Sequence, residues 1–465
     1  MTRFVLFTLM GVFVCISELL AEVSGDSFKI RYVKIEGNEK TKDFVVLKQV
    51  PVSFGDTLTQ KQIGYYVDRV YSLGLFTAVS HRLDFNSDTN DYDLVIIVHE
   101  KWFWLIYPVV RFKDSNVSRF LQNPSGTKVQ YGFGGSHINF LGRRMSLRMQ
   151  ALVGYDLNLG FFFNNPHSYL DDNLSFGVSV SYQEVHNQNP YLIESDGEFV
   201  RKIRSLSNSY GYAFSPYLNT GISVYYSSIS NSLLESPDSD RETVLNPGGA
   251  SDDNFGVGIG FSYDTRDIYE FPMKGVFASG GIGFSQEINT GSSYESSKID
   301  LRYYYPVIEG LTVAGNFLHQ KYYGKLVPYY DHFTTGKDEI IRGFENQTIE
   351  TVHRMISRFE IRKEIIPAKT EVIDWISWEQ FKYFRWAVFG YVYSDFGYNF
   401  IPDQTYSGLN LFIENNNLTR FYNNLLSNLG VGIHISLPYN NTLRLEYNYN
   451  SLHQQSFWIN STRPF

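Results

Sequence analysis

Apolar and polar residues follow a mixed pattern over roughly the first hundred residues. Residues 28–36 alternate as in a β-strand and end in Gly37-Asn38, a pair typical of a turn. Apolar residues then recur at helical spacing in residues 43–50 and 57–76. Two more strand-like runs, "AVSHRLDF" and "YDLVIIVHE", are separated by a polar turn. This region is therefore predicted to run strand, helix, helix, strand, strand.

From about Trp102 onward the period changes to two. In residues 254–267, bulky apolar residues occupy every second position, and glycine, serine, asparagine or aspartate stand between them. The same alternation occurs in residues 429–437 and 442–450, which a tight turn joins. A soluble sandwich also alternates, but polar residues on the inner face favour a wet lumen over a dry core between sheets. The inner-face residues that decide this are Arg444, Glu446 and Asn448.

The remaining length sets the number of strands. At about 10 residues per membrane strand, the roughly 360 residues after Trp102 supply around sixteen strands with their turns and loops. Polar stretches at residues 187–202, 235–253 and 401–420 are candidate extracellular loops. Residues 370–384 have helix-like spacing and predict a surface helix.

Composition narrows the class of protein. Aromatic residues make up 17% of the chain, supplied mainly by 35 Tyr and 37 Phe, and the net charge is −8. Aromatic girdles at both membrane interfaces of a transmembrane β-barrel account for this richness. No segment after the N-terminus approaches the 18 apolar residues of a membrane helix, and no basic field points to nucleic acid.

The first 25 residues have the layout of a secretory signal peptide. Arg3 is followed by an apolar run and then by small residues near Ala21 and at residues 23–25. Cys15 is the sole cysteine, and the bulky Val14 before it disfavours a lipoprotein signal. A mature chain without cysteine has no disulfide framework, no thiolate metal site and no cysteine nucleophile.

Candidate chemistry is sparse. His137, His319 and His353 are dispersed along the chain and lack metal-ligand spacing, so neither a metal site nor a cofactor is expected. Asp264, Thr265, Arg266 and Asp267 suit a strand-end ion pair and turn better than a lumenal charge site. No acid, base and nucleophile converge in the sequence, and the protein is not expected to be an enzyme.

Several motifs together resemble a known family. Residues 28–101 resemble a POTRA (polypeptide-transport-associated) domain, and the residues that carry this likeness are Gly37, Asn38, Thr41, Gly55, Gly74, Phe76 and Glu100. The later region resembles the barrel of the bacterial surface antigen superfamily, which includes outer membrane protein assembly factors. Its motifs here are "GGSHINFLGRR", "FFFNNPHSYL", "YDTRDIYEFPMKG", "IIRGFENQ", "YSDFGYNF" and a terminal Phe465.

The resemblance implies a mainly β fold in three parts. These are a signal peptide (1–25), an α+β POTRA domain (26–101) and a transmembrane antiparallel β-barrel (102–465) of about 16 strands. The implied location is the bacterial outer membrane, with the POTRA domain in the periplasm. Only one POTRA domain fits before the barrel, whereas members of the assembly machinery resemble strings of several.

The implied function is to assist the insertion, assembly or translocation of polypeptides. The expected partners are outer-membrane lipid, unfolded or extended polypeptide clients, and periplasmic or outer-membrane accessory proteins, with no nucleic acid. A dedicated secretion pore for one passenger remains an alternative. A general porin would not explain the POTRA domain, and a barrel-anchored enzyme lacks convergent residues.

The resemblance also gives a role to Arg342. It places "IIRGF" at the tip of a loop that folds back into the lumen, where Arg342 contacts Glu360 and Asp395. A guanidinium offers five donors in a planar fork and can engage two carboxylates at once. Gly343 would permit a tight turn and Phe344 would wedge the tip against the wall, with Gly397 in the same lock. From the residues alone, Arg342 is equally an ordinary exposed loop arginine.

Overall fold

The computed structural model describes most of the chain. The described residues are 27–112, 129–186, 200–231, 251–324, 327–336, 339–345, 347, 349–400 and 418–460. The signal peptide expected at residues 1–25 and the terminal Phe465 lie outside these residues, as does most of each candidate extracellular loop.

The N-terminal region forms a four-stranded sheet with two helices. Its elements are β1 (Ser27–Glu36), α2 (Asp43–Leu47), β2 (Thr57–Thr59), α3 (Gln60–Ser72), β3 (Phe76–Asn86) and β4 (Asp91–Glu100). The strand order is β2-β1-β4-β3, with β1 and β4 parallel. Helix α3 begins at a capping box in which Thr59 and Gln62 satisfy each other's backbone N–H groups. The predicted order is confirmed, with the short β2 added.

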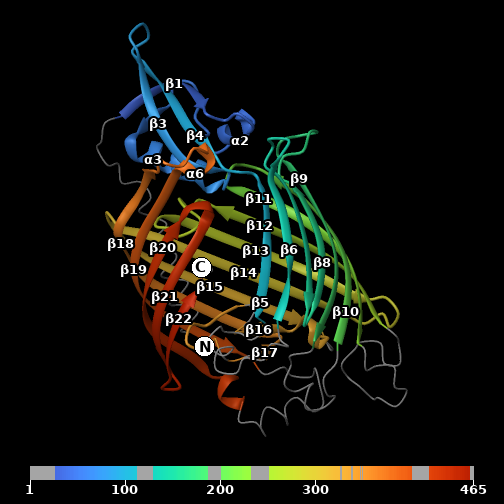
Figure 1. The fold of residues 1–465 in the computed structure, drawn as a ribbon. Helices are drawn as coiled ribbons and strands as arrows, with labels where there is room; N and C mark the ends of the chain where they lie inside the picture. The colour runs from blue at the N-terminus through green and yellow to red at the C-terminus, as the bar shows by residue number, and fades with distance from the viewer. Residues whose placement is uncertain are drawn as a thin grey trace, which may run out of the picture.

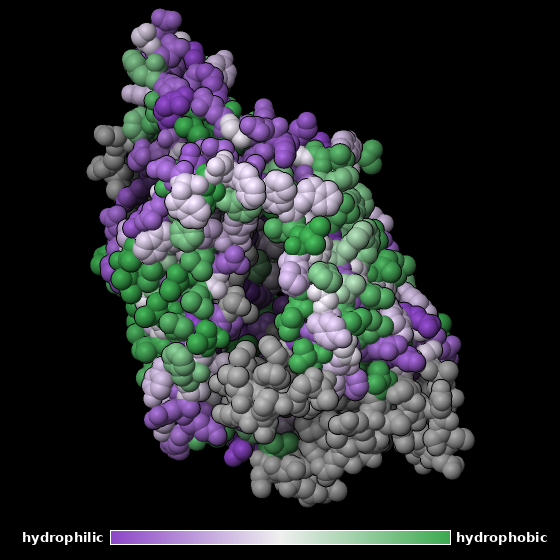
Figure 2. All heavy atoms as spheres, in the orientation of Figure 1, coloured by the Kyte–Doolittle hydropathy of each residue, from purple (hydrophilic) through white to green (hydrophobic). Residues whose placement is uncertain are grey.

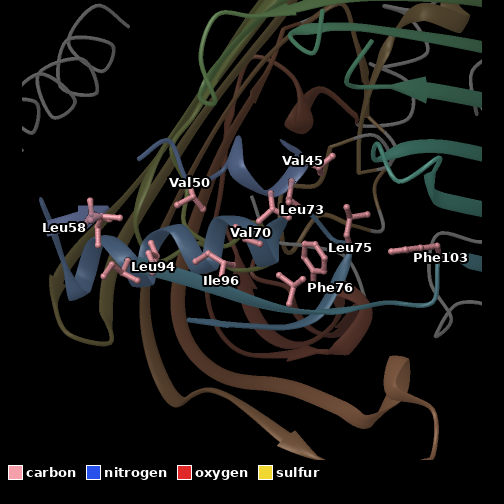
Figure 3. Close-up of a cluster of buried hydrophobic side chains, with 14 residues drawn as sticks. Val45, Val50, Leu58, Val70, Leu73, Leu75, Phe76, Leu94, Ile96 and Phe103 are labelled. Atoms are coloured by element: carbon pink, nitrogen blue, oxygen red, sulfur yellow. The ribbon is translucent and has the colours of Figure 1, made fainter. Parts of the chain in front are cut away.

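Helices and sheet share one apolar core. Figure 3 shows Val70 of α3 close to Ile96 of β4, and the same cluster contains Leu94 of β4 and Leu73, which directly follows α3. Phe76, the first residue of β3, is fully buried in this cluster. Because each fully buried aliphatic or aromatic side chain stabilises the fold by about 1.5–3 kcal/mol, this core is what holds the small domain together.

Sixteen of the remaining strands form one antiparallel sheet (Figure 1). This confirms the predicted fold class and strand number. In chain order they are β5 (Trp104–Phe112), β6 (Val129–Phe140), β7 (Met145–Gly154), β8 (Leu157–Asn165), β9 (Leu174–His186), β10 (Val200–Ala213), β11 (Leu218–Asn231), β12 (Asp252–Asp264), β13 (Gly275–Glu287), β14 (Ser293–Ile308), β15 (Leu311–Tyr323), β18 (His353–Val372), β19 (Tyr383–Asn399), β20 (Leu425–Leu437), β21 (Asn441–Asn450) and β22 (Gln455–Asn460).

The two faces of this sheet differ as the alternation predicts. On β12, Phe255, Ile259 and Phe261 are 43–58% exposed and point outward, while the glycines between them face inward. Figure 2 shows apolar side chains gathered over the barrel wall. On β21 the inner residues Arg444 and Glu446 are buried, because a segment of the chain covers them inside the barrel. Part of the lumen is therefore filled.

The first and last strands of the sheet form a seam. Consecutive strands pair from β5 to β22, but no ladder pair joins β5 to β22 in the part of the chain that is described. Figure 2 shows a hollow on this face, between the two edges. Among the described residues the ladder is therefore not continuous around the barrel, and the six residues of β22 stand beside the nine of β5.

The helix expected over residues 370–384 is wrong for most of its length. Strand β18 continues to Val372 and β19 begins at Tyr383, with Val372 opposite Tyr383 and Lys369 opposite Trp386. Only α6 (Glu379–Lys382) is helical. Cross-strand pairing in the long hairpin outweighs the local helical spacing. Among the described residues, no helix is long and apolar enough to cross a membrane.

The N-terminal domain lies against one end of the barrel (Figure 1). The Lys42 backbone N–H donates to the Gly142 carbonyl oxygen at 2.9 Å, in the turn between β6 and β7. On the far side, Arg385 of β19 pairs with Asp68 at 3.3 Å. His99 also stacks on Tyr383, with ring centroids 3.7 Å apart. Contacts on opposite sides hold the domain over the mouth of the barrel.

We predict heat-modifiable migration of the purified protein. The sixteen-stranded ladder pairs most backbone groups of its strands internally, so residues from about 103 onward should persist as a compact barrel in detergent. Unboiled and boiled samples should therefore run at different positions on a gel. Identical migration, with the protein recovered in the soluble periplasm, would contradict the barrel.

Candidate functional site

A long loop between β15 and β18 enters the barrel. Its described parts include η1 (Tyr329–Asp331), β16 (Phe333–Thr335), β17 (Ile349–Thr351) and the tip at residues 339–345. Ile341 and Phe344 at the tip are 0–1% exposed and pack in an apolar cluster with residues of the wall. Burial of these two side chains fixes the tip inside the lumen rather than in solvent.

Arg342 makes the central contacts of the tip. Its Nε and Nη2 atoms donate to the two carboxylate oxygens of Asp395 at 2.9 and 2.5 Å, and its backbone N–H donates to Asp395 at 3.0 Å. Its Nη1 donates to Glu360 at 2.6 Å and lies 3.5 Å from an oxygen of Glu446. The guanidinium also lies 3.7 Å from the centre of the Tyr393 ring. One arginine thus joins three strands of the wall.

All of these charges are shielded from water. Arg342 is 5% exposed, and Glu360, Asp395 and Glu446 are 0–2% exposed. A buried ion loses several kcal/mol of hydration, which only close and well-aligned partners offset. The bidentate fork to Asp395 supplies that alignment. An exposed loop arginine is therefore not what the structure contains.

Backbone geometry around Arg342 depends on two glycines. Gly343 has φ of +85°, and a Cβ there would lie 2.8 Å from the Asn448 side-chain oxygen. Gly397 lies on β19, where a Cβ would stand 1.9 Å from the Ile341 side chain. The structure thus brings together all six residues that the resemblance assigned to the lock, and each contacts the tip or belongs to it.

Sequence reasoning missed several partners of the tip. Asn428 donates to the Arg342 carbonyl oxygen, and Asn450 donates to that of Gly343 at 2.6 Å. Glu446 and Tyr393 were also missed. The available signal was the inner-face alternation of residues 444–450, which marks these polar side chains as lumenal without saying what they contact.

A second inserted segment meets the same cluster from the other end of the barrel. Arg362 donates to Glu360 at 2.7 Å and to the Pro272 carbonyl oxygen at 2.6 Å. Its guanidinium lies 4.3 Å from the centre of the buried Phe271 ring, which stacks on Phe389. Glu360 therefore contacts Arg342 of the tip directly and is connected to the turn between β12 and β13 through Arg362.

That turn also contacts helix α3. Tyr65 donates to the Thr265 carbonyl oxygen at 3.0 Å, and Ser72 donates to that of Asp267 at 3.2 Å. Arg266 pairs with Asp264 at 2.8 Å, which is the strand-end ion pair suggested by the sequence. Direct contacts therefore run from Arg342, through the turn, to the N-terminal domain.

The motif residues of the N-terminal domain gather where it meets the barrel. Glu100 accepts hydrogen bonds from the Thr41 backbone and hydroxyl, both at 2.6 Å, and Asn38 donates to the Thr41 carbonyl oxygen at 3.0 Å. Asn139 of β6 donates to the same hydroxyl at 2.9 Å. Gly37 has φ of +90°, and a Cβ there would clash with the Val98 carbonyl oxygen.

The other motif residues lie farther from the barrel contacts. Gly55 precedes β2 and Gly74 follows α3, both with positive φ, and Phe76 is in the core. No group of three or more His, Cys, Asp or Glu residues arranged to hold a metal ion occurs among the described residues. Although 34 residues separate them in the sequence, the side chains of His319 and His353 meet in the structure.

Two family models match this chain. Residues 139–372, just over half of the 465 residues, match the Omp85 superfamily domain. The chain belongs to the Omp85 superfamily. Residues 28–101 of this Omp85 protein match the POTRA model, described as a surface antigen variable number repeat. The family resemblance is confirmed, and the chain is an outer-membrane POTRA-barrel protein of the assembly or translocation type.

Solved structures are similar to this Omp85 protein in fold. BamA from Haemophilus ducreyi lacking POTRA domains 1–3 has a TM-score of 0.50 and 16% identity, over 93% of this chain and 83% of that one. CdiB from Acinetobacter baumannii gives 0.47 and 13%, over 93% and 73%. CdiB from Escherichia coli gives 0.48 and 10%, over 96% and 90%. At these identities the likeness to BamA extends to the fold alone.

We predict that Arg342 and Asp395 are strongly coupled in the Omp85 barrel. Arg342→Ala leaves buried carboxylates unpaired and should cost about 3 kcal/mol. Arg342→Lys should rescue only part of this, because a point charge does not reproduce the fork. In a double-mutant cycle with Asp395→Asn, read by the midpoint of heat-modifiable migration, the two effects should be far from additive.

Lys369→Ala provides the control for this cycle. Lys369 pairs with Glu371 two residues away on β18 at 2.9 Å, and both side chains are about half exposed. Its loss should have little effect, because exposed ion pairs contribute little to stability. Independent effects of Arg342→Ala and Asp395→Asn would show that the two side chains do not act as a pair.

Proposed function

We propose that this Omp85 protein binds extended segments of polypeptide clients at its sheet edges and assists their insertion into, or passage across, the outer membrane. The observation that carries the proposal is the seam between β5 and β22, whose facing edges are not joined by ladder pairs in the described residues. Unpaired edge groups form backbone hydrogen bonds with an added strand, and they do so for many client sequences.

The N-terminal sheet supports the proposal with a second edge. Strand β2 pairs only with Ser27, Phe28 and Lys29 of β1, while β1 continues to Glu36 along β4. Beside this edge lie Tyr32, 55% exposed, and Phe54, 71% exposed, with ring centroids 6.0 Å apart. An extended peptide that paired with β1 beyond the end of β2 would form backbone hydrogen bonds with β1 and contact both rings.

The lumenal lock supplies rigidity in this proposal. Arg342 holds β18, β19 and β21, and β21 pairs with the edge strand β22. A wall fixed in this way keeps the β22 edge in one conformation while clients exchange. We assign the residues from 26 to 101 to the periplasm, where they would meet clients first, and we propose no catalytic role.

The proposed function has two alternative forms: the assembly of many barrel proteins, or the export of one passenger protein. We favour assembly or insertion, because recognition through backbone groups is tolerant of sequence. Depletion of the protein, followed by proteomics of the outer membrane and of secreted proteins, separates them. We expect broad loss of barrel proteins, whereas loss of one secreted protein alone would assign a dedicated secretion pore.

We predict weak, sequence-tolerant binding of barrel-derived peptides to the isolated residues 26–101. Chemical shifts along β1 should move when peptide is added, and proline substitutions within residues 32–36 should weaken binding more than alanine at the same positions. Alanine variants are the matched controls because they keep the backbone N–H. If no shift moves at millimolar peptide, this edge does not bind clients.

A further inference from the structure

Two histidines face each other on neighbouring strands of the barrel. His319 lies on β15 and His353 is the first residue of β18, and their Nε2 atoms are 3.1 Å apart. The ring centroids are 5.1 Å apart and the rings are nearly perpendicular, at 85°. The lock uses neither side chain, since the inward positions next to them are occupied by Leu318, Gln320 and Arg354.

The separation of these nitrogens matches that of two ligands of one metal ion. With metal–nitrogen distances of about 2.0–2.1 Å, adjacent imidazole nitrogens are about 3.3 Å apart in a tetrahedral site. They are about 2.9 Å apart in a square-planar site of the kind Cu²⁺ prefers. The observed 3.1 Å lies between the two values. A hydrogen bond explains the distance too, but only when one ring is the donor and the other the acceptor.

Neighbouring side chains orient one of the two rings, and both rings are partly exposed. His353 stacks flat on Phe400, with ring centroids 3.8 Å apart and an angle of 1°, which holds its ring in place. Lys321 stands opposite His353 in the ladder, but its ammonium lies over the Tyr323 ring at 4.6 Å. Stacking thus orients one ligand, and the nearest lysine is directed along its own strand.

We propose that His319 and His353 form a two-imidazole binding site for a transition-metal dication such as Zn²⁺ or Cu²⁺. Since no set of three candidate ligands occurs within the described ranges, these two residues supply the protein's share and water fills the remaining positions. This site goes beyond the proposed handling of polypeptides and does not depend on it.

The place of the site suggests what bound metal does. The loop that carries Arg342 begins after the end of β15 and ends at His353, the first residue of β18, so the two ligands stand at the stem of the loop. A metal ion would tie β15 to β18 on the outer face, while Arg342 ties the tip to the inner face. Bound metal should therefore raise the temperature at which the compact form is lost, because a ligand of the folded state alone stabilises it.

Calorimetric titration of the full-length, tag-free protein in detergent with ZnCl₂ at pH 7.5 tests the site. We expect one saturable equivalent that is lost, or weakened at least tenfold, in both His319→Asn and His353→Asn. His453→Asn is the matched control, since it removes a histidine of the turn between β21 and β22 and should keep that equivalent. The double variant should bind no more weakly than either single variant.

A spectroscopic readout tests the same geometry independently. Cu²⁺ bound to the wild type should show coupling to two equivalent nitrogens, reduced in each single variant. All variants should keep heat-modifiable migration, because both side chains lie outside the lumenal lock. Absence of a saturable equivalent in the wild type, or its survival in both single variants, would overturn the proposal and leave the two rings as a hydrogen-bonded pair.

Discussion

The cost of burying the Arg342 guanidinium is the constraint on which the lumenal architecture depends. A charge this far from water is tolerated only when carboxylates replace its hydration on several sides. Asp395, Glu360 and Glu446 do so from three different strands. The loop tip, the glycine that lets it turn and the cavity-filling Ile341 and Phe344 are all arranged around that requirement.

Backbone hydrogen bonding sets the second requirement. In a lipid environment each strand needs a partner on both sides, and fourteen of the sixteen have one in the described ladder. The two that lack one, β5 and β22, stand at the seam. Both edges of the described sheet therefore lie in one place, next to the wall that Arg342 stiffens, and this is where the proposed client strand would pair.

Contacts between the lock and the N-terminal domain are continuous. Glu360 binds both Arg342 and Arg362, Arg362 binds the Pro272 carbonyl oxygen, and the same turn accepts hydrogen bonds from α3. Each link is an ion pair or hydrogen bond between groups with limited freedom to move. A rearrangement of the domain over the barrel mouth would therefore disturb the turn first and the lock next, so the N-terminal domain and the lumen are physically connected.

The sequence by itself determined the fold class. A period of two places alternate residues of each strand on opposite faces of the sheet, and the high Tyr and Phe content fits aromatic girdles at the two membrane interfaces. It also indicated Arg342, Glu360 and Asp395, through resemblance to a family. It placed Glu446 on the inner face but did not indicate that this residue contacts Arg342, 104 residues away, or that His319 and His353 meet. It also predicted a helix at residues 370–384, where cross-strand pairing forms a hairpin. Only the tertiary structure decided these points, because the register between distant strands and the path of the inserted loop depend on packing of the whole barrel rather than on local pattern.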